Sequence, residues 1–385
     1  MVHARPRVNI VGAGIAGLAL GRCLLKNGVP FNIFEKKPSI PSHRYGIVLH
    51  EDAYQPLFDY LGQANIKRAI AVDRRFGGKG LLINDTGSHP SDKFCAEHGA
   101  LLETLRQGLT IDFGHDLVDC SPTKEGMTLF FRNGRSSTAP ITVDAGGESS
   151  GLRARLCPNV RPAVLPWVAL HGVRIVSQAT FEAEYADIYG DSNHISLGRT
   201  ELGDWELTLT KTHLGEDKVE MRYTLLRPAS LTGDPLFRPD RTPQEAAVIP
   251  EEFWLEMDRL VAGCRDEAIK LVLDTGKMKS DRLLSWLMRT SLVPPSTTQE
   301  LAQLGVYSLG DAYYSTPITV SGGANRALRA AFELARQIEE GSTSMATTPS
   351  QCPLDSAAEV DPSRLDVTYR LNDYIKAMTS LLLHH

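Results

Sequence analysis

Apolar and polar positions change their spacing several times along the first forty residues. Residues 8–11 (VNIV) form a short β-branched run, which is typical of a buried parallel strand. Residues 15–26 repeat apolar side chains at helical spacing and stop at an Asn-Gly pair, and a second apolar run follows at 31–35. The pattern predicts a strand, a helix and a second strand, the opening unit of a parallel α/β sheet.

The middle of the chain instead alternates apolar and polar residues with a period of two. Short polar turns separate several of these segments, so we expect an antiparallel sheet. The predicted strands are residues 161–172, 173–181, 193–200, 205–212 and 219–228. Arg222 and Tyr223 are neighbours on the last strand, so only one of them can face a given side of the sheet.

After the predicted sheet, the chain continues with a helical region, then with a strand and a helix around residue 310, and finally with a C-terminal tail. Residues 243–275 predict helices, and residues 341–363 form a Ser/Thr/Pro-rich linker. Residues 364–385 have the pattern of a closing amphipathic helix. The chain contains no internal repeat, and its 385 residues suit two domains of modest size.

Composition excludes several function classes. Hydrophobic residues make up 42% of the chain and the net charge is −5, which disfavours nucleic acid and anionic membranes as partners. Six scattered cysteines and eleven dispersed histidines show no metal-ligand spacing, so we expect reduced thiols and no metal.

Targeting signals are also absent from the pattern. The chain has no apolar run of membrane-spanning length, and its first residues run directly into a strand and leave no room for a signal peptide. We therefore expect a cytoplasmic protein, a monomer or a weak dimer.

Three glycines follow the first strand as G-x-G-x-x-G. In this motif Gly12 permits a tight turn, Gly14 lets the backbone approach a pyrophosphate, and Gly17 lets the helix pack closely on the strand. Glu35, at the end of the second strand, is placed to accept hydrogen bonds from an adenosine ribose. The unit predicts a dinucleotide that contains ADP, and by itself it does not separate NAD from FAD.

A second glycine site lies near residue 310. The strand 306–309 delivers Gly310-Asp311, a loop with Pro317 follows, and a helix begins near Asn325. A carboxylate at a strand end accepts hydrogen bonds from polyol hydroxyls, and N–H groups at a helix N-terminus stabilise negative charge.

With both sites in place, the sequence resembles the class A flavoprotein monooxygenases of the para-hydroxybenzoate hydroxylase superfamily. Within that family it is most similar to the tetracycline-inactivating and fungal biosynthetic branches. The resemblance implies FAD as cofactor and NADPH as co-substrate. It also implies transfer of one O₂-derived oxygen to an aromatic or polycyclic natural product, by hydroxylation, epoxidation or Baeyer–Villiger insertion.

The same resemblance implies a fold and a set of cofactor contacts. The fold is α/β, a discontinuous Rossmann-like FAD-binding domain with an inserted α+β substrate domain built on an antiparallel sheet. The FAD-binding domain is expected in residues 1–75, 95–160 and 285–340, and the substrate domain in residues 76–94 and 161–284. The expected FAD contacts are Gly12, Gly14, Ala16, Gly17, Glu35, Lys36, Arg44, His98, Gly310, Asp311, Pro317, Gly323, Ala324 and Asn325.

The chain departs from the family pattern at two of its cofactor contacts. His98 stands where the family has an arginine that reaches the FAD phosphates. In the segment 143–153 (VDAGGESSGLR), Gly146 stands where the family has an aspartate linked to NADPH binding, while Ser150 and Arg153 match. These gaps motivate an alternative, a cyclase or isomerase on the same fold without redox turnover. A plain NAD-binding dehydrogenase or binding module would leave Gly310-Asp311 unexplained.

No side chain is catalytic throughout this family, so the catalytic candidates come from position alone. Arg222 or Tyr223 is placed to point from the sheet at the substrate, and an arginine there would stabilise a phenolate. Tyr313, beside Asp311, is placed to line the pocket next to the flavin, as is Tyr314. His50 and His171 are candidate bases.

Overall fold

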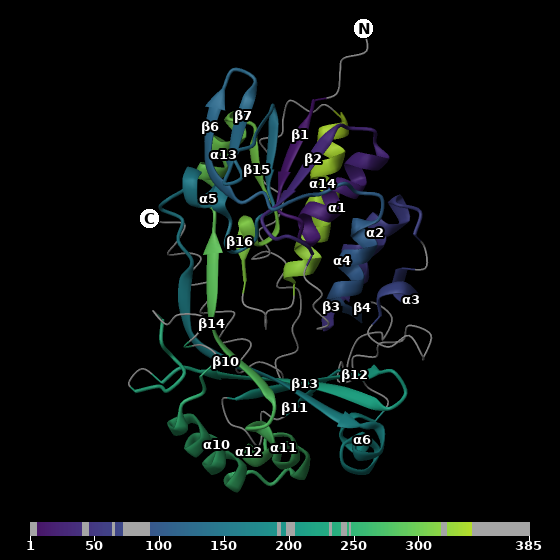
Figure 1. The fold of residues 1–385 in the computed structure, drawn as a ribbon, viewed down its shortest axis with the longest axis vertical. Coiled ribbons are helices and arrows are strands. Elements are labelled where there is room, and N and C mark those ends of the chain that lie inside the picture. Colours follow the sequence, from purple (N-terminus) through teal and green to yellow (C-terminus); the bar gives the residue numbers. More distant parts are fainter. Residues whose placement is uncertain are drawn as a thin grey trace. The chain divides into compact units, whose positions relative to one another are not determined.

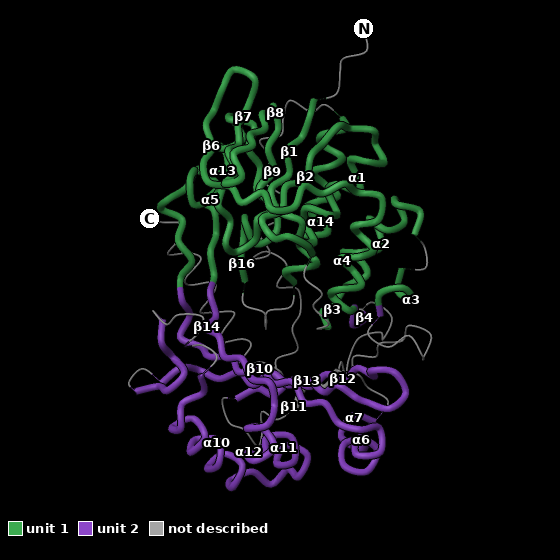
Figure 2. The backbone as a smooth tube through the Cα atoms, in the orientation of Figure 1, with its two compact units in different colours: residues 1–70, 97–163, 290–385 green, residues 71–96, 164–289 purple. Residues whose placement is uncertain are grey.

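The chain divides into two units, and each unit is built from segments that are separated in sequence. The computed structural model describes residues 6–40, 46–63, 66–71, 93–190, 194–197, 205–230, 233–239, 245, 248–316 and 322–340. Unit 1 comprises residues 1–70, 97–163 and 290–385, and unit 2 comprises residues 71–96 and 164–289 (Figure 2).

Unit 1 is organised around a parallel sheet with strand order β15-β9-β1-β2-β5. Its strands are β1 (Val8–Val11), β2 (Phe31–Glu35), β5 (Asp112–Phe113), β9 (Ile141–Asp144) and β15 (Val306–Ser308). Every residue of β1 and β9 is buried, as expected for strands covered on both faces. Because all four pairings are parallel, the strands end at the same edge of the sheet.

Helices surround this sheet in unit 1 (Figure 1). Helix α1 packs against α14 and α4, and α14 also contacts α2. The buried residues of α14 recur every three or four positions, which explains the face that it presents to the core. The helices are α1 (Ile15–Lys26), α2 (Glu51–Tyr60), α3 (Ile66–Ile70), α4 (His98–Arg106), α5 (Gly151–Leu156), α13 (Pro295–Gln303), α14 (Gly323–Glu340) and the short 3-10 helix η1 (Gly310–Ala312).

Shorter strands complete unit 1. An antiparallel sheet of three strands comprises β6 (Leu117–Thr123), β7 (Gly126–Phe131) and β8 (Ser136–Ala139). Strand β3 (Gly46–His50) precedes α2, and β16 (Tyr314–Ser315) follows η1. Aromatic side chains Phe34 and Phe131 pack with ring centroids 4.6 Å apart and join β2 to β7.

Unit 2 is organised around an antiparallel sheet. Long strands make up most of it: β10 (Ala163–Ser177), β11 (His194–Leu197), β12 (Glu206–Leu214), β13 (Lys218–Pro228) and β14 (Arg282–Leu292). The order is β11-β12-β13-β10-β14, and β16 pairs with the last residues of β14. Strand β4 (Lys93–Glu97) precedes α4.

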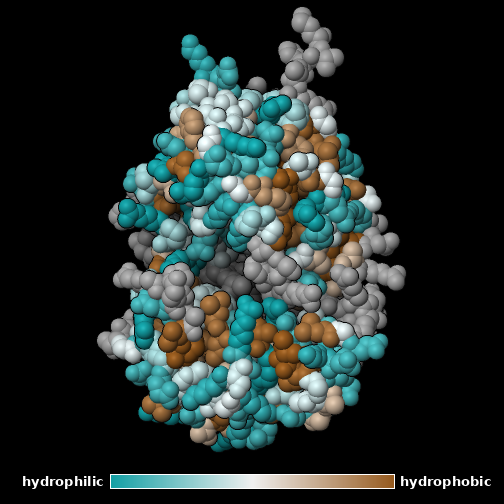
Figure 3. Space-filling view, viewed as in Figure 1, coloured by the Kyte–Doolittle hydropathy of each residue, from teal (hydrophilic) through white to brown (hydrophobic). Residues whose placement is uncertain are grey.

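One face of this sheet carries the hydrophobic core of unit 2. Side chains from β10, β12 and β13 pack there with Phe253, Trp254 and Met257 of helix α10. The helices of unit 2 are α6 (Gln178–Glu184), α7 (Ala186–Tyr189), α10 (Glu251–Gly263), α11 (Glu267–Val272) and α12 (Thr275–Met278). On the surface, brown hydrophobic side chains are interspersed with teal hydrophilic ones (Figure 3), and Ile175 and Leu284 are about half exposed.

The fold class predicted from sequence is confirmed, and the strand–helix–strand opening has the expected bounds. The strand predicted at 173–181 is wrong at its end. Strand β10 stops at Ser177, whose hydroxyl accepts a hydrogen bond from the Thr180 N–H and caps helix α6. No described helix is both long and apolar enough to cross a membrane. The predicted linker at 341–363 and the helix at 364–385 lie outside the described residues.

Candidate functional site

The turn after β1 contains glycines that the packing of the protein requires and one glycine that this packing does not require. Gly12 has φ +109°, and a Cβ there would lie 2.3 Å from the carbonyl oxygen of Ala145, so only glycine fits. A Cβ on Gly17 would lie 2.1 Å from the carbonyl oxygen of Gly12. Gly14 is different, because a Cβ there would meet no atom within 4 Å. The chain itself does not require glycine at position 14, and a ligand against the N-terminus of α1 would.

Glu35 and Lys36 at the end of β2 border this turn. The Glu35 carboxylate accepts hydrogen bonds from the N–H of Ala13 at 2.8 Å and from the N–H of Lys37 at 2.9 Å. Both bonds fix the carboxylate beside the turn. The Lys36 ammonium donates to the Ser149 hydroxyl at 3.0 Å, which brings the end of β2 close to the segment that follows β9.

The second glycine site lies at the same edge of the sheet. Gly310 has φ +58°, and its Cβ position is 3.3 Å from the Cβ of Ala16, so the two motifs are in contact. Asp311 is exposed to solvent, yet the surrounding protein raises the pKa of its carboxyl by desolvation, while Arg326 and Arg153 oppose this rise. An exposed carboxylate closely surrounded by protein is suited to accepting hydrogen bonds from ligand hydroxyls.

Strand β9 ends on a carboxylate, Asp144, to which the sequence motifs assign no role. Asp144 is 1% exposed and accepts hydrogen bonds from the Ser150 hydroxyl at 2.6 Å and from the Gly146 N–H at 3.0 Å. Burial raises the pKa of Asp144, and the hydrogen bonds and Arg153 oppose the rise. The Asp144 carboxylate thus holds the bend between Asp144 and Ser150 from inside, and position 146 itself carries no side chain.

Arg153 connects this bend to the second glycine site. Its guanidinium is buried and donates to the carbonyl oxygens of Asp311 and Ala312 at 3.1 Å, and to the Ser291 hydroxyl at 3.1 Å. It also donates to the carbonyl oxygen of Glu148. The arginine therefore fixes the backbone that carries Asp311.

Helices α14 and α4 supply the remaining predicted cofactor contacts. Gly323 is the first residue of α14, Ala324 follows it, and a Cβ on Gly323 would lie 3.6 Å from the Asp311 carboxylate. The Asn325 side chain is buried, accepts from the His50 N–H at 2.9 Å and donates to the Val48 carbonyl at 3.0 Å. Asn325 thus ties the start of α14 to β3.

The other predicted residues of unit 1 are placed as follows. His98 is half-buried and is the first residue of α4. Tyr313 packs against the hydrophobic cluster that includes Phe34, and the Arg326 guanidinium lies 4.9 Å from the ring centroid of Tyr314. Arg44 and Pro317 lie outside the described residues.

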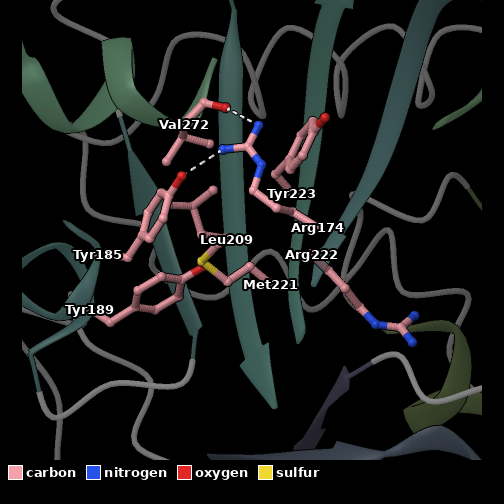
Figure 4. A pocket seen from close by; sticks show the side chains of 8 residues that line it. All are labelled: Arg174, Tyr185, Tyr189, Leu209, Met221, Arg222, Tyr223 and Val272. Atoms are coloured by element: carbon pink, nitrogen blue, oxygen red, sulfur yellow. Dashed lines mark hydrogen bonds between the residues drawn. The ribbon is translucent and has the colours of Figure 1, made fainter. Parts of the chain in front are cut away.

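In unit 2 the structure separates Arg222 from Tyr223. Tyr223 is 2% exposed, and its hydroxyl donates to Asp281 at 2.9 Å. Asp281 also binds Arg174 at 2.8 Å in a buried ion pair. Figure 4 shows Arg174 and Tyr223 together around a small cavity, whereas the Arg222 side chain points away from them. Tyr223 belongs to the core, and the structure does not support a substrate contact for it.

The edge of the parallel sheet can accommodate a dinucleotide. Its features are the open position beside Gly14, the N-terminus of α1, and the carboxylates of Glu35 and Asp311. Parallel strands β1, β2 and β15 bring all of them to one edge, because each feature lies at the end of one of these strands or shortly after it.

No protein-family model matches the chain, but curated relatives and solved structures do. The chain is 29% identical over 363 residues to the FAD-dependent monooxygenase aptC of Emericella nidulans, covering 86% of this chain and 85% of the relative.

Among solved structures, it is similar to 2,6-dihydroxypyridine-3-hydroxylase from Arthrobacter nicotinovorans, with a TM-score of 0.67, 18% identity, and coverage of 88% and 85%. It is also similar to CtdE in complex with FAD, with a TM-score of 0.63, 14% identity, and coverage of 88% and 85%. The resemblance predicted from the motifs is confirmed: the chain is a homologue of the FAD-dependent monooxygenases and shares the fold of the flavin hydroxylases.

Proposed function

We propose that the protein is an FAD-dependent monooxygenase that oxidises NAD(P)H and transfers one atom of O₂ to an aromatic or polycyclic substrate. The second oxygen atom leaves as water, with two electrons from the nicotinamide. The observation that carries the proposal is the meeting of the Gly12–Gly17 turn, the Asp311 carboxylate and the Asp144 bend at one sheet edge. The relatives named above support it.

Each group at this edge has a role that its chemistry suits. The N–H groups at the start of α1 would bind the pyrophosphate, and Glu35 would accept hydrogen bonds from the ribose. Asp311 would accept from the ribityl hydroxyls. Bound FAD would supply the redox chemistry, and the protein would bind it, orient the substrate and exclude water. The full set of proposed FAD contacts is Gly12, Gly14, Ala16, Gly17, Glu35, Lys36, Arg44, His98, Gly310, Asp311, Pro317, Gly323, Ala324 and Asn325.

The redox-free alternative is not favoured. It was motivated by the missing carboxylate at Gly146 and by the histidine at position 98. At the first of these, Asp144 holds the bend through Ser150 and Gly146. The bend keeps its connection to the Asp311 backbone through Arg153. The substitution at His98 leaves an imidazole at the start of α4, which still binds anions when it is protonated.

The test is a flavin titration followed by turnover. The purified protein is mixed with FAD, and bound flavin is measured by its absorption and by quenching of its fluorescence. Consumption of NADPH and of NADH is then followed with a panel of hydroxylated aromatic compounds, and products formed under ¹⁸O₂ are examined by mass spectrometry. The proposal predicts bound flavin, substrate-stimulated NAD(P)H oxidation and one ¹⁸O atom per product.

A matched pair of variants makes the titration specific. Asp311→Asn removes the carboxylate that would bind the ribityl chain, while Asp119→Asn removes an exposed carboxylate on β6. Weaker FAD binding is expected for Asp311→Asn alone. A protein that binds no FAD and converts a substrate without O₂ would overturn the proposal.

A further inference from the structure

The face of the unit 2 sheet opposite its helices carries polar side chains on neighbouring strands. On β13, Glu220, Arg222 and Thr224 share this face, because Tyr223 between them points into the core. The register pairs Thr224 with His171 of β10. Residues paired directly across an antiparallel ladder lie on the same face, so His171 and Arg222 belong to one surface.

His171 is held in a defined orientation on this surface. Its Nδ1 lies 3.0 Å from the Thr224 hydroxyl oxygen. The imidazole and the indole of Trp286 on β14 have ring centroids 6.0 Å apart. Both rings are half-buried, and Nε2 of His171 makes no hydrogen bond to any residue that the structure describes. The surface therefore presents one ring nitrogen beside an aromatic plane.

The charges around His171 keep its imidazole neutral. Burial, together with the charges of Arg222 of β13 and Arg282 of β14, lowers the pKa of His171 to about 4. Glu220 forms an ion pair with Arg222 at 2.7 Å and compensates part of that charge. A neutral imidazole whose Nδ1–H donates to Thr224 has a lone pair on Nε2 and accepts a hydrogen bond there.

Apolar side chains extend the same surface. Ile175, paired with Glu220, is 55% exposed, and Leu284, two residues before Trp286 on β14, is 49% exposed. Half-exposed aliphatic groups beside an indole suit a flat ring system, and nearby guanidinium groups suit an acidic hydroxyl. The chemistry of the surface thus matches a planar phenol better than an aliphatic or cationic ligand.

We infer that His171 is a specificity-determining residue, whose Nε2 accepts a hydrogen bond from a phenolic or enolic hydroxyl of a planar substrate lying against Trp286. The inference rests on the proposed function and names the substrate class of the same enzyme. Thr224 acts as a positioning residue, because its hydroxyl fixes the imidazole. Arg222 and Arg282 favour the acidic hydroxyl by their charge.

The test compares 2-naphthol with its methyl ether, 2-methoxynaphthalene, which cannot donate a hydrogen bond, by isothermal titration calorimetry on the FAD-treated protein. One hydrogen bond from a phenol to a buried acceptor corresponds to roughly a tenfold preference for 2-naphthol. His171→Phe should reduce this preference to within about twofold, and His171→Gln, which keeps an acceptor, should restore part of it. Thr224→Val should reduce the preference partly.

The control is Thr212→Val, since Thr212 pairs with Glu220 and not with Thr224 in the ladder. This variant should keep the wild-type preference. An unchanged preference in His171→Phe, or no preference in the wild-type protein, would overturn the inference. Flavin content and NAD(P)H consumption, measured on the same samples, report separately on the proposed function.

Discussion

The three glycines of the turn after β1 should respond differently to a single added methyl group. Gly17 and Gly14 make the sharpest pair. In Gly17→Ala the new Cβ would lie 2.1 Å from the Gly12 carbonyl oxygen, so strand and helix must separate. In Gly14→Ala the new Cβ meets no protein atom within 4 Å, and the backbone angles of Gly14 (φ −81°, ψ −173°) are allowed for alanine.

The expected magnitudes follow from these contacts. Alanine in a helix gains about 1 kcal/mol over glycine, but overpacking against backbone costs about 1–3 kcal/mol or more. Because the new Cβ would meet backbone, the upper end of that cost applies, and Gly17→Ala should lose roughly 2 kcal/mol net, which lowers the thermal midpoint by roughly 4–8 °C. Gly14→Ala should leave the midpoint unchanged or raise it, since alanine restricts the unfolded chain.

For FAD binding the expected order is reversed, and Gly14→Ala should be the variant with the larger loss of affinity. A methyl group at position 14 would occupy the space proposed for the pyrophosphate, and a loss of about 2–3 kcal/mol corresponds to roughly 30- to 150-fold weaker FAD binding. The assay pairs thermal unfolding by circular dichroism without FAD with a fluorescence titration by FAD. Equal destabilisation by both substitutions, or wild-type FAD affinity in Gly14→Ala, would refute this reasoning.

Three further predictions concern single carboxylates and their partners. Glu35→Ala removes the acceptor of the Ala13 N–H and the proposed ribose contact, so FAD affinity should fall about tenfold in the same titration; unchanged affinity would exclude the ribose role. Arg174→Leu leaves Asp281 buried without its ion pair and should cost about 3–5 kcal/mol by urea unfolding, and Asp281→Asn in that background should recover part of the loss. Burial raises the pKa of Asp144 above its ordinary value of 3.8, so the folded state binds this proton more tightly and loses stability as pH rises through the raised pKa. Asp144→Asn should therefore gain stability relative to the wild type as pH rises above the ordinary pKa of 3.8, and a pH-independent difference in urea midpoints would contradict the assignment.

Several elements were readable from sequence because their signals are local. The β-branched run of β1, the glycine spacing and the Asn27 C-cap predict the opening unit with its observed bounds. The end of β10 was missed although it also has a local signal. Ser177 is the N-cap of α6, and its hydroxyl accepts a hydrogen bond from the Thr180 N–H. This capping signal competes with the alternation of apolar and polar residues that predicts a continuing strand.

The site was readable only in part. Motif spacing predicted Gly12, Gly14, Glu35 and Asp311 as a set, and the structure brings the segments that carry them to one sheet edge. The role of Asp144 was not readable, since its hydrogen bonds to Ser150 and Gly146 depend on the path of the bend.

In unit 2 the alternation along β13 determined that Arg222 and Tyr223 face opposite sides of a sheet. It did not determine which side is the core. That choice depends on helix α10 and on Asp281. Asp281 binds Arg174, which is 107 residues away in the sequence, and accepts a hydrogen bond from the Tyr223 hydroxyl.

The sequence by itself thus determined the periodicity of each strand, the glycine turns and the kind of ligand that they suit, because these depend on backbone sterics within a few residues. Only the tertiary structure decided which polar groups share a surface. Strand pairing sets His171 beside Thr224 and Trp286, and burial sets the protonation of His171 and Asp144, because desolvation depends on every atom packed around a group.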